Sequence, residues 1–289
     1  MTTTNREAGE LIATIWSDIF YEELKQQNIL SPLFLRSDYE GEIGQQGDTI
    51  KVNQIAKPAS EEIDLETADA DAQTNITSNN LKVNQVEIKA KWVATCNVEF
   101  GSFLQLQGQS FEDMLRVEMF QAVFDQVETR IWAQLLASDG SGGTPDHQTA
   151  VASKNILTLD NIIAQRTLLN TQKVPTMDRW AVIGNMVYPS LLKIEQFTNK
   201  DYISGDNVPI QNGAVRNVLN FNVVESNSTP AEVSKFFHRS ALAFVPQLRP
   251  QVKVSDMHAA GKRGYLASID MVYAADTLDK NRVTQLINP

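Results

Sequence analysis

The hydrophobic positions of this chain alternate in two segments that share the tetrapeptide KVNQ. In TIKVNQI (49–55), Ile50 and Val52 alternate with polar residues, which is the period of a strand with one solvated face. In NNLKVNQVEIKAKW (79–92), the apolar positions change from odd to even numbers after Val83, so we expect a bulge or bend there. The two segments predict a two-stranded arm. Such a ribbon is marginal in water and nothing obvious in this chain covers it, so we expect another subunit to do so.

The loop between the two strands is strongly acidic. Residues 59–80 contain six carboxylates and no Lys or Arg. They lack the ligand ladder and central glycine of a calcium loop, and we interpret them as a solvated loop that meets a basic neighbour. The candidate contact residues are Glu61, Glu62, Asp64, Glu66, Asp69 and Asp71 in the loop, and Arg249, Lys253, Lys262 and Arg263 near the C-terminal turn.

Two segments have the three- and four-residue period of amphipathic helices. The first covers residues 5–30 and is expected to end at Ser31-Pro32, because the residue before proline avoids the helical region. The second is a rod over 110–138 that begins at a Ser-x-x-Asp cap and stops before Asp139-Gly140. Its predicted apolar stripe is Val117, Phe120, Phe124, Val127, Ile131 and Leu135, and its predicted polar face carries Glu112, Arg116, Asp125, Glu128 and Arg130.

The second half of the chain interleaves helices and strands without a regular βαβ period. A helix is predicted from Thr158, a buried strand over 179–184 and a short helix over 188–197. Strands are predicted over 218–227 and 241–248. A last strand is predicted over 264–287, alternating through Tyr265, Ala267, Ile269, Met271 and Tyr273.

Charge and composition exclude several classes of protein. The 289 residues include 35 acids against 25 Lys and Arg, a net charge of −10, which argues against nucleic-acid recognition. The longest apolar runs, such as 241–245, are too short to span a bilayer, and we expect no membrane partner. The N-terminus lacks the pattern of a secretory signal. A single cysteine, Cys96, fits a reducing compartment.

Candidate catalytic residues are few. His147 and His258 are predicted in loops and His238 before a strand, and none has a nucleophile elbow or a metal-ligand spacing partner nearby. Cys96 lies in a strand-like run and is interpreted as a small buried hydrophobe. The sequence contains no phosphate-binding loop. We therefore expect no enzyme activity, no cofactor and no metal site.

The order of these segments resembles the major capsid proteins of tailed bacteriophages. The resemblance extends over roughly 10–285 and rests on WSDIFYEEL (16–24), GDTIKVNQI (47–55), the 110–138 helix, VPTMDRWAVIGNMVYPSLL (174–192), GAVRNVLNFNVVESN (213–227) and GYLASIDMVYAADTLDKNRV (264–283). One departure is Asn220, where similar proteins often place glycine before the Phe-x-Val strand.

This resemblance implies an α+β chain with the Hong Kong-phage shell fold, also called the Johnson fold. The implied parts are an N-terminal arm (1–46), an extended hairpin loop (47–92), a peripheral domain (93–154) with a spine helix (110–138), an axial α/β domain (155–260) and a C-terminal return strand (261–289). The implied function is self-assembly through pentamers and hexamers into an icosahedral head around double-stranded DNA. The protein would be found in the virion capsid after assembly in the host cytoplasm.

The resemblance also implies partners. The absence of a long N-terminal extension suggests a separate scaffolding protein, with portal and decoration proteins as further partners and packaged DNA held without sequence-specific contacts. Two alternatives stay open. A shell around a protein cargo would use the same fold without DNA or scaffold. A hydrolase using His238 or Cys96 would need a pocket that gathers these residues with carboxylates.

Overall fold

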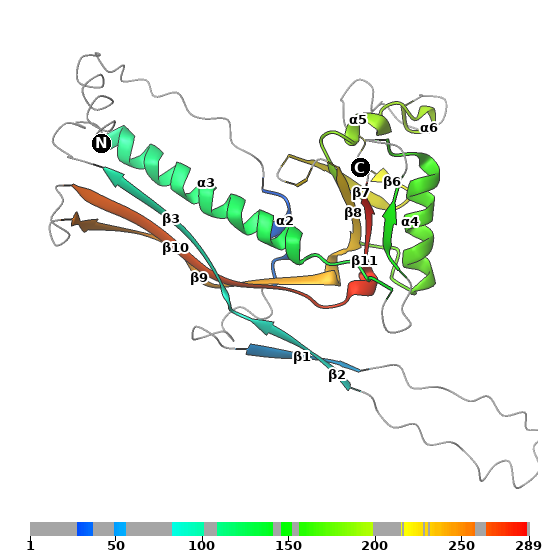
Figure 1. Ribbon diagram of the computed structural model, residues 1–289, viewed down its shortest axis with the longest axis horizontal. Helices are drawn as coiled ribbons and strands as arrows, with labels where there is room; N and C mark the ends of the chain where they lie inside the picture. Colours follow the sequence, from blue (N-terminus) through cyan, green and yellow to red (C-terminus); the bar gives the residue numbers. More distant parts are fainter. Residues whose placement is uncertain are drawn as a thin grey trace, which may run out of the picture.

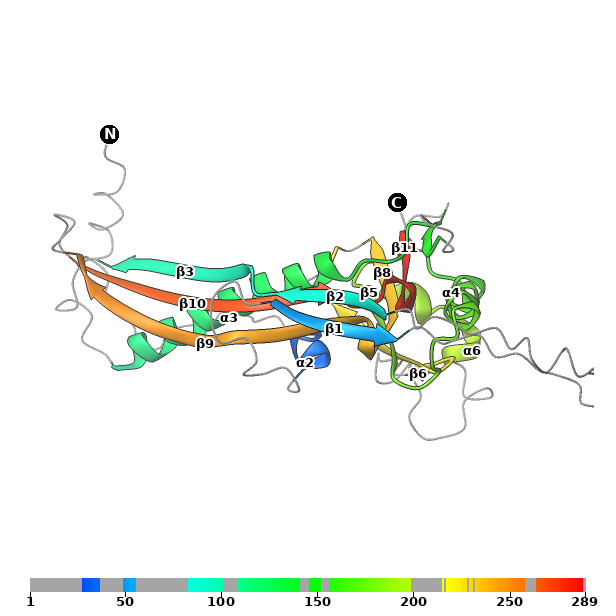
Figure 2. The same ribbon diagram turned by 90° about the horizontal axis from the view of Figure 1, so that it is seen from below.

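A long three-stranded sheet forms one lobe of the molecule (Figures 1 and 2). The computed structural model describes residues 28–36, 49–55, 83–100, 109–140, 146–151, 156–198, 215, 217–227, 229–230, 232–257 and 264–287. The sheet has the order β3-β10-β9, with both pairs antiparallel. Its strands are β3 (Trp92–Phe100), β9 (Leu242–Asp256) and β10 (Tyr265–Thr277). The alternation predicted for the last strand holds from Ala267 to Met271, but Tyr265 is only half-buried and every residue from Met271 to Ala275 is buried. The single strand predicted over 264–287 is wrong, because β10 ends at Thr277 and β11 (Val283–Ile287) belongs to the other sheet.

Helix α3 (Gln109–Gln134) lies along one face of this sheet (Figure 1). Its 26 residues make a rod of about 40 Å. Val127, Ile131 and Leu135 are buried as predicted, but Val117 is 48% exposed. Phe120 and Phe124 are partly buried and pack against the core, and Met119 and Val123 are buried beside them, so the buried face of this part of the helix is shifted from the predicted stripe.

The rod ends at Gln134, four residues before the predicted end. Its last carbonyl groups are bound by residues from distant strands: the Lys235 ammonium donates to the carbonyls of Trp132 and Leu135, and the Thr277 hydroxyl donates to that of Gln134. These long-range bonds satisfy carbonyls that a helix leaves unpaired. The predicted stop at Asp139-Gly140 is therefore wrong because tertiary contacts end the helix first.

The second lobe is a six-stranded mixed sheet of order β4-β11-β8-β5-β7-β6. Strand β5 is parallel to β7, β11 is parallel to β4, and the other pairs are antiparallel. Helix α4 (Leu159–Thr171) begins directly after Thr158, where a helix start was predicted, and the Thr158 hydroxyl accepts the Asn161 N–H as an N-cap. The remaining elements are β4 (Gln148–Ala150), β5 (Arg179–Gly184), α5 (Tyr188–Leu191), α6 (Glu195–Thr198), β6 (Asn217–Val218), β7 (Phe221–Ser226), β8 (Val233–His238), η5 (Arg239–Ala241), η7 (Lys280–Arg282) and β11 (Val283–Ile287).

A tight turn joins β6 to β7 at Leu219 and Asn220, the second of which was expected to depart from similar proteins. Leu219 and Asn220 both adopt left-handed backbone conformations, with φ of 50° and 68°. Asparagine tolerates this region better than most residues other than glycine. Asn220 therefore supports the turn that glycine would otherwise make.

The predicted hairpin is present, and its base is covered by its own chain. Strands β1 (Thr49–Ile55) and β2 (Val83–Lys89) pair without a register shift, so the bulge expected after Val83 is wrong. That side chain instead faces solvent, with 44% exposed. Ile88 is fully buried in a cluster with Ala243, Val245 and Ala274 at the root of β9 and β10. The expectation that nothing in the chain covers the ribbon is therefore wrong at this end.

Candidate functional site

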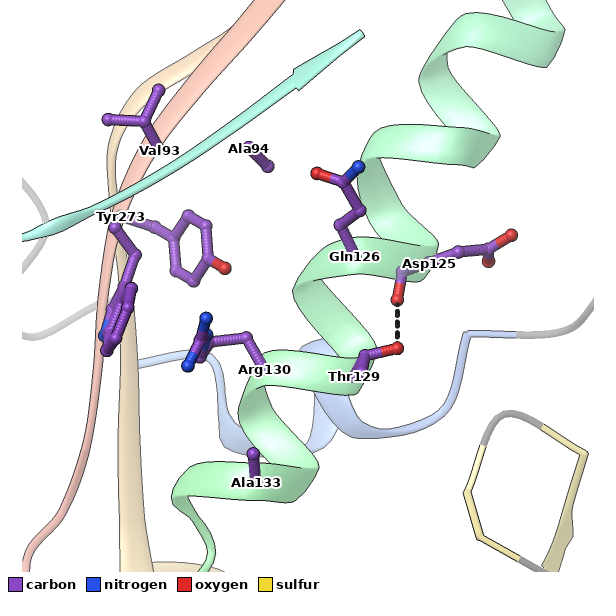
Figure 3. Close-up of a pocket in the computed structure, with 9 residues that line it drawn as sticks. Val93, Ala94, Asp125, Gln126, Thr129, Arg130, Ala133 and Tyr273 are labelled. Atoms are coloured by element: carbon purple, nitrogen blue, oxygen red, sulfur yellow. Dashed lines mark hydrogen bonds between the residues drawn. The ribbon is translucent and has the colours of Figure 1, made fainter.

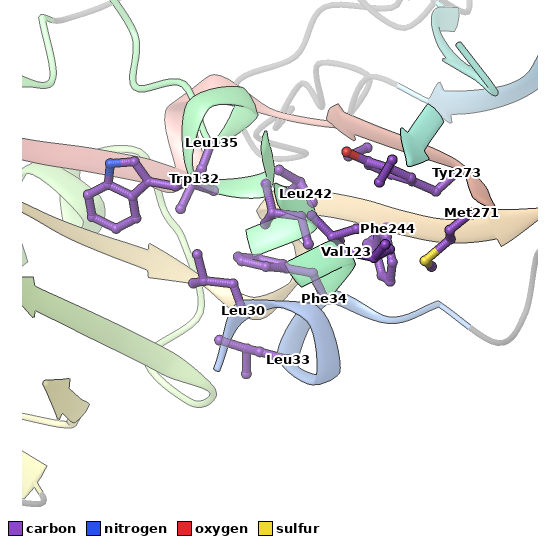
Figure 4. Close-up of a cluster of buried hydrophobic side chains, with 14 of the residues drawn as sticks. Leu30, Leu33, Phe34, Val123, Trp132, Leu135, Leu242, Phe244, Met271 and Tyr273 are labelled. Atoms are coloured by element: carbon purple, nitrogen blue, oxygen red, sulfur yellow. The ribbon is translucent and has the colours of Figure 1, made fainter. Parts of the chain in front are cut away.

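A short helix, α2 (Leu30–Phe34), anchors the segment that follows the N-terminal region (Figure 4). The predicted helix over 5–30 lies mostly outside the described residues, and its predicted end at Ser31-Pro32 is wrong. Pro32 is tolerated because it occupies the first turn of α2, where a backbone N–H has no helical partner to lose. Leu30, Leu33 and Phe34 are buried in the main core cluster.

Glu128 of α3 holds α2 in place. Its side chain is 1% exposed, and its two carboxylate oxygens accept the backbone N–H groups of Leu30 at 2.9 Å and Ser31 at 2.6 Å. The prediction that Glu128 lies on the polar face of the helix is wrong. Glu128 lies one helical turn before Ile131 and Trp132, which are both buried. Its spacing therefore placed it beside the buried stripe, although its charge indicated the polar face.

Two more contacts fix the same segment at the junction of the lobes. The Arg239 Nε donates to the Leu33 carbonyl at 3.1 Å, and the Arg36 backbone N–H donates to the Phe244 carbonyl at 3.1 Å. The Phe34 ring lies 5.0 Å from the ring of Phe237 in β8. The root of the N-terminal segment thus contacts α3, β9 and the six-stranded sheet together.

Lys235 of β8 joins the six-stranded sheet to the end of α3. Its Nζ lies 2.7 Å from both carbonyl oxygens that it binds and 4.5 Å from the centroid of the Trp132 ring. Burial lowers the pKa of Lys235 to about 8. A cation at a helix C-terminus also interacts favourably with the helix dipole. The sequence analysis did not single out this residue.

Arg179 organises the turn between α4 and β5. Its side chain is fully buried and donates to the carbonyls of Pro175 and Val174 and to the amide oxygen of Asn170, at 2.7–2.8 Å. Burial, with a smaller contribution from the Arg166 charge, lowers the pKa of the guanidinium. This role was also missed, since the sequence analysis read 179–184 only as a buried strand.

A pocket of about 530 Å³ opens between α3 and β3 (Figure 3). The Arg130 guanidinium lies 3.7 Å from the centroid of the Trp92 ring and hydrogen bonds to the Tyr273 side chain. Burial raises the pKa of Tyr273, and the Arg130 charge and hydrogen bond act in the opposite direction. The rim includes the exposed residues Gln126 and Thr129.

Most of the predicted contact residues lie outside the described part of the chain. This holds for the six loop carboxylates, Lys262 and Arg263. Lys253 is exposed on β9, an edge strand of its sheet. Arg249 belongs to the same strand, and only its backbone is described. The structure therefore does not bring the acidic and basic candidates together within one subunit, and their contact stays a prediction.

Three of the four candidate catalytic residues are described, and each contacts backbone groups or the hydrophobic core. His147 is buried rather than in a polar loop, with Nδ1 2.9 Å from the Val283 carbonyl oxygen. His238 Nδ1 accepts the Ser240 N–H at the start of η5, and burial, then the Arg282 charge, lowers its pKa. Cys96 is half-buried on β3, packed against the core. His258 lies outside the described residues.

Within the described ranges, no three His, Cys, Asp or Glu residues gather as metal ligands, and no helix there could span a membrane.

The family model for phage capsid proteins matches residues 118–287, which is more than half of the chain. The chain belongs to the phage capsid protein family. Its fold is similar to that of a solved protein chain from Mycobacterium phage Che8 (TM-score 0.74, 19% identity, covering 94% of this chain and 96% of that one). It is also similar to a chain of the capsid of the cyanophage P-SCSP1u (TM-score 0.71, 14% identity, covering 96% of this chain and 93% of that one). A chain of the bacteriophage PhiM1 mature capsid is similar as well (TM-score 0.67, 12% identity, covering 95% of this chain and 91% of that one). No curated protein matches the chain.

These findings confirm the fold class and the shell role predicted from the segment order. The chain is a phage capsid protein, a structural protein of the virion shell that associates with copies of itself. Neither the cargo shell nor the hydrolase is favoured by the family match.

Proposed function

We propose that this capsid protein is the major subunit of the head of a tailed bacteriophage, assembled through pentamers and hexamers around double-stranded DNA. Its membership of the phage capsid protein family and the shell fold support this proposal. The three-stranded lobe would be the peripheral domain with α3 as its spine, and the six-stranded lobe would be the axial domain around the five- and six-fold axes. The proposed role is structural rather than enzymatic.

The observation that carries the proposal is the hairpin arm. Beyond its base, β1 pairs only with β2 among the described strands, and the ion pair between Lys51 and Glu87 (3.6 Å) is more than half exposed on both sides. Two-stranded ribbons of this kind need a surface to pack against. We infer that a neighbouring subunit supplies it, in heterologous contacts that close on symmetry.

The charge of the subunit agrees with a DNA container. A net charge of −10 keeps the wall from adhering to the packaged polymer, while counterions screen the repulsion. Contacts with DNA would then be independent of sequence. Scaffolding, portal and decoration proteins, and assembly in the host cytoplasm, are proposed from the family resemblance.

Electron microscopy of particles from cells that express the chain tests this function. The chain would be expressed alone and together with the neighbouring structural genes of its phage. We expect closed icosahedral shells in at least one condition. Small monodisperse oligomers under every condition would contradict the proposal.

A further inference from the structure

We infer that the pocket between α3 and β3 binds a carboxylate from the acidic segment 59–80 of a second copy of this chain. The inference rests on the proposed self-assembly and names one of its docking points. It assigns the cationic partner to Arg130, which the sequence analysis placed only on a polar helix face.

Arg130 is a cation prepared for an anion that the described residues do not supply. None of the carboxylates in the described ranges forms an ion pair with it. Asp125 also lines the pocket, but its carboxylate points away from Arg130 (Figure 3) and accepts a hydrogen bond from Gln121 at 2.8 Å. The Trp92 ring and the Tyr273 side chain orient the guanidinium without neutralising it.

The geometry suits a carboxylate. A guanidinium offers donors in a planar fork that matches two carboxylate oxygens, and stacking on an aromatic face fixes that plane in advance. Gln126 is exposed at the rim and its amide can donate a further hydrogen bond, whereas the hydroxyl of Thr129 already donates to the Asp125 backbone carbonyl. Two exposed apolar residues, Val93 and Ala133, would pack against the stem of the incoming side chain.

The acidic segment of another copy is the occupant that this chain offers. Residues 59–80 carry six carboxylates and no Lys or Arg. Within one subunit, the strand ends that flank this segment, Ile55 of β1 and Val83 of β2, lie at the end of the ribbon remote from α3 and β3 (Figure 1). Six residue steps from Lys89 to Val83 add about 20 Å to that separation. A neighbour's arm has no such constraint.

A double-mutant cycle on the full chain tests the pairing. One variant is Arg130→Gln, and the other replaces all six loop carboxylates by amides (E61Q, E62Q, D64N, E66Q, D69N, D71N). Lys193→Gln, which removes one exposed positive charge from the other lobe, is the control. The readout is the lowest protein concentration at which shells form, measured by light scattering and electron microscopy.

We expect each of the two changes to raise this concentration roughly tenfold or more, the size of one charge-assisted contact per subunit. The combined variant should assemble no worse than the more impaired of the two single variants, and Lys193→Gln should assemble like the wild type. Additive effects of the two changes, or assembly of Arg130→Gln like the wild type, would overturn the inference. Failure of the wild-type chain to form shells would instead contradict the proposed function.

A competition experiment on the wild-type chain avoids any folding defect of a variant. A synthetic peptide of residues 59–80 should inhibit wild-type assembly, whereas the same peptide with amides in place of its carboxylates should not. In heteronuclear NMR spectra of unassembled subunits, the acidic peptide should shift the Trp92 and Arg130 side-chain signals. Inhibition that leaves these signals unchanged would place the contact elsewhere, for example at Lys253, and would overturn the assignment of the pocket.

Discussion

The Glu128 carboxylate accepts the backbone N–H of Ser31 at 2.6 Å across 97 residues of sequence. Its second oxygen accepts the N–H of Leu30, so one buried side chain satisfies two donors at the start of α2. This pair ties the root of the N-terminal segment to the long helix. In a shell subunit, these two hydrogen bonds fix the position of Leu30 and Ser31 relative to α3.

Replacing Glu128 by glutamine should loosen α2. The amide keeps one acceptor but presents an NH2 group to the other backbone N–H, so a buried donor loses its partner. We expect a loss of about 1–3 kcal/mol in the free energy of unfolding and faster hydrogen exchange at residues 30–34. Urea denaturation and exchange mass spectrometry measure both. Glu87→Gln, at an exposed ion pair, should change stability by less than about 1 kcal/mol; an equal effect of the two substitutions would refute the anchoring role.

Lys235 should make stability depend on pH above neutrality. Its pKa is lowered from 10.5 to about 8 in the folded protein, so between these values the unfolded chain binds more protons. Stability contributed by this group should therefore rise as pH increases from 8 to 10.5, by up to about 3 kcal/mol. The neutral amine still has two N–H groups for the two carbonyls.

Urea denaturation of the wild type and of Lys235→Met at pH 7 and pH 10 isolates this effect, because the other titrating groups are common to both proteins. The free energy of unfolding of the wild type, relative to the variant, should be higher at pH 10. A difference that stays constant with pH would show that the ammonium carries no burial penalty.

Arg179→Lys should destabilise the six-stranded lobe. Lysine cannot reproduce the fork that contacts Pro175, Val174 and Asn170, and it would leave buried acceptors unpaired. We expect a loss of about 2–4 kcal/mol by thermal or chemical denaturation. Lys193→Arg, at an exposed position, should leave the transition unchanged. Tolerance of Arg179→Lys would mean that the turn after α4 holds without these bonds.

Deleting 59–80 should separate folding from assembly. The base of the hairpin keeps its buried contacts at Ile88 and Ala90, so the subunit should fold with a circular dichroism spectrum and denaturation midpoint close to the wild type. Stable shells should not form. If the deletion instead unfolded the isolated subunit, the loop would belong to the subunit's own core.

The period of hydrophobic residues predicted those strands and helices that pack one face against a single neighbouring element. The alternation from Ala267 to Met271 in β10 and the start of a helix at Thr158 were visible because a strand or helix end shows its environment in adjacent residues. Strand β5 matches its predicted range, 179–184. The order of such elements was sufficient for the family resemblance, which the family model then confirmed.

Long-range contacts could not be predicted in this way. Lys235 and Glu128 look like surface residues in sequence, and only their partners in α3 and α2 explain why they are buried. For the same reason, the end of α3 was predicted too late. The acidic loop and Lys262 lie outside the described residues, so their proposed contacts await the assembled particle.

A cryo-electron microscopy reconstruction of the assembled particle tests the central claim most directly. We expect a closed icosahedral shell in which the distal part of the arm over 47–92 rests on a neighbouring subunit. A shell, or any other oligomer, in which that arm contacts only its own subunit would contradict the account.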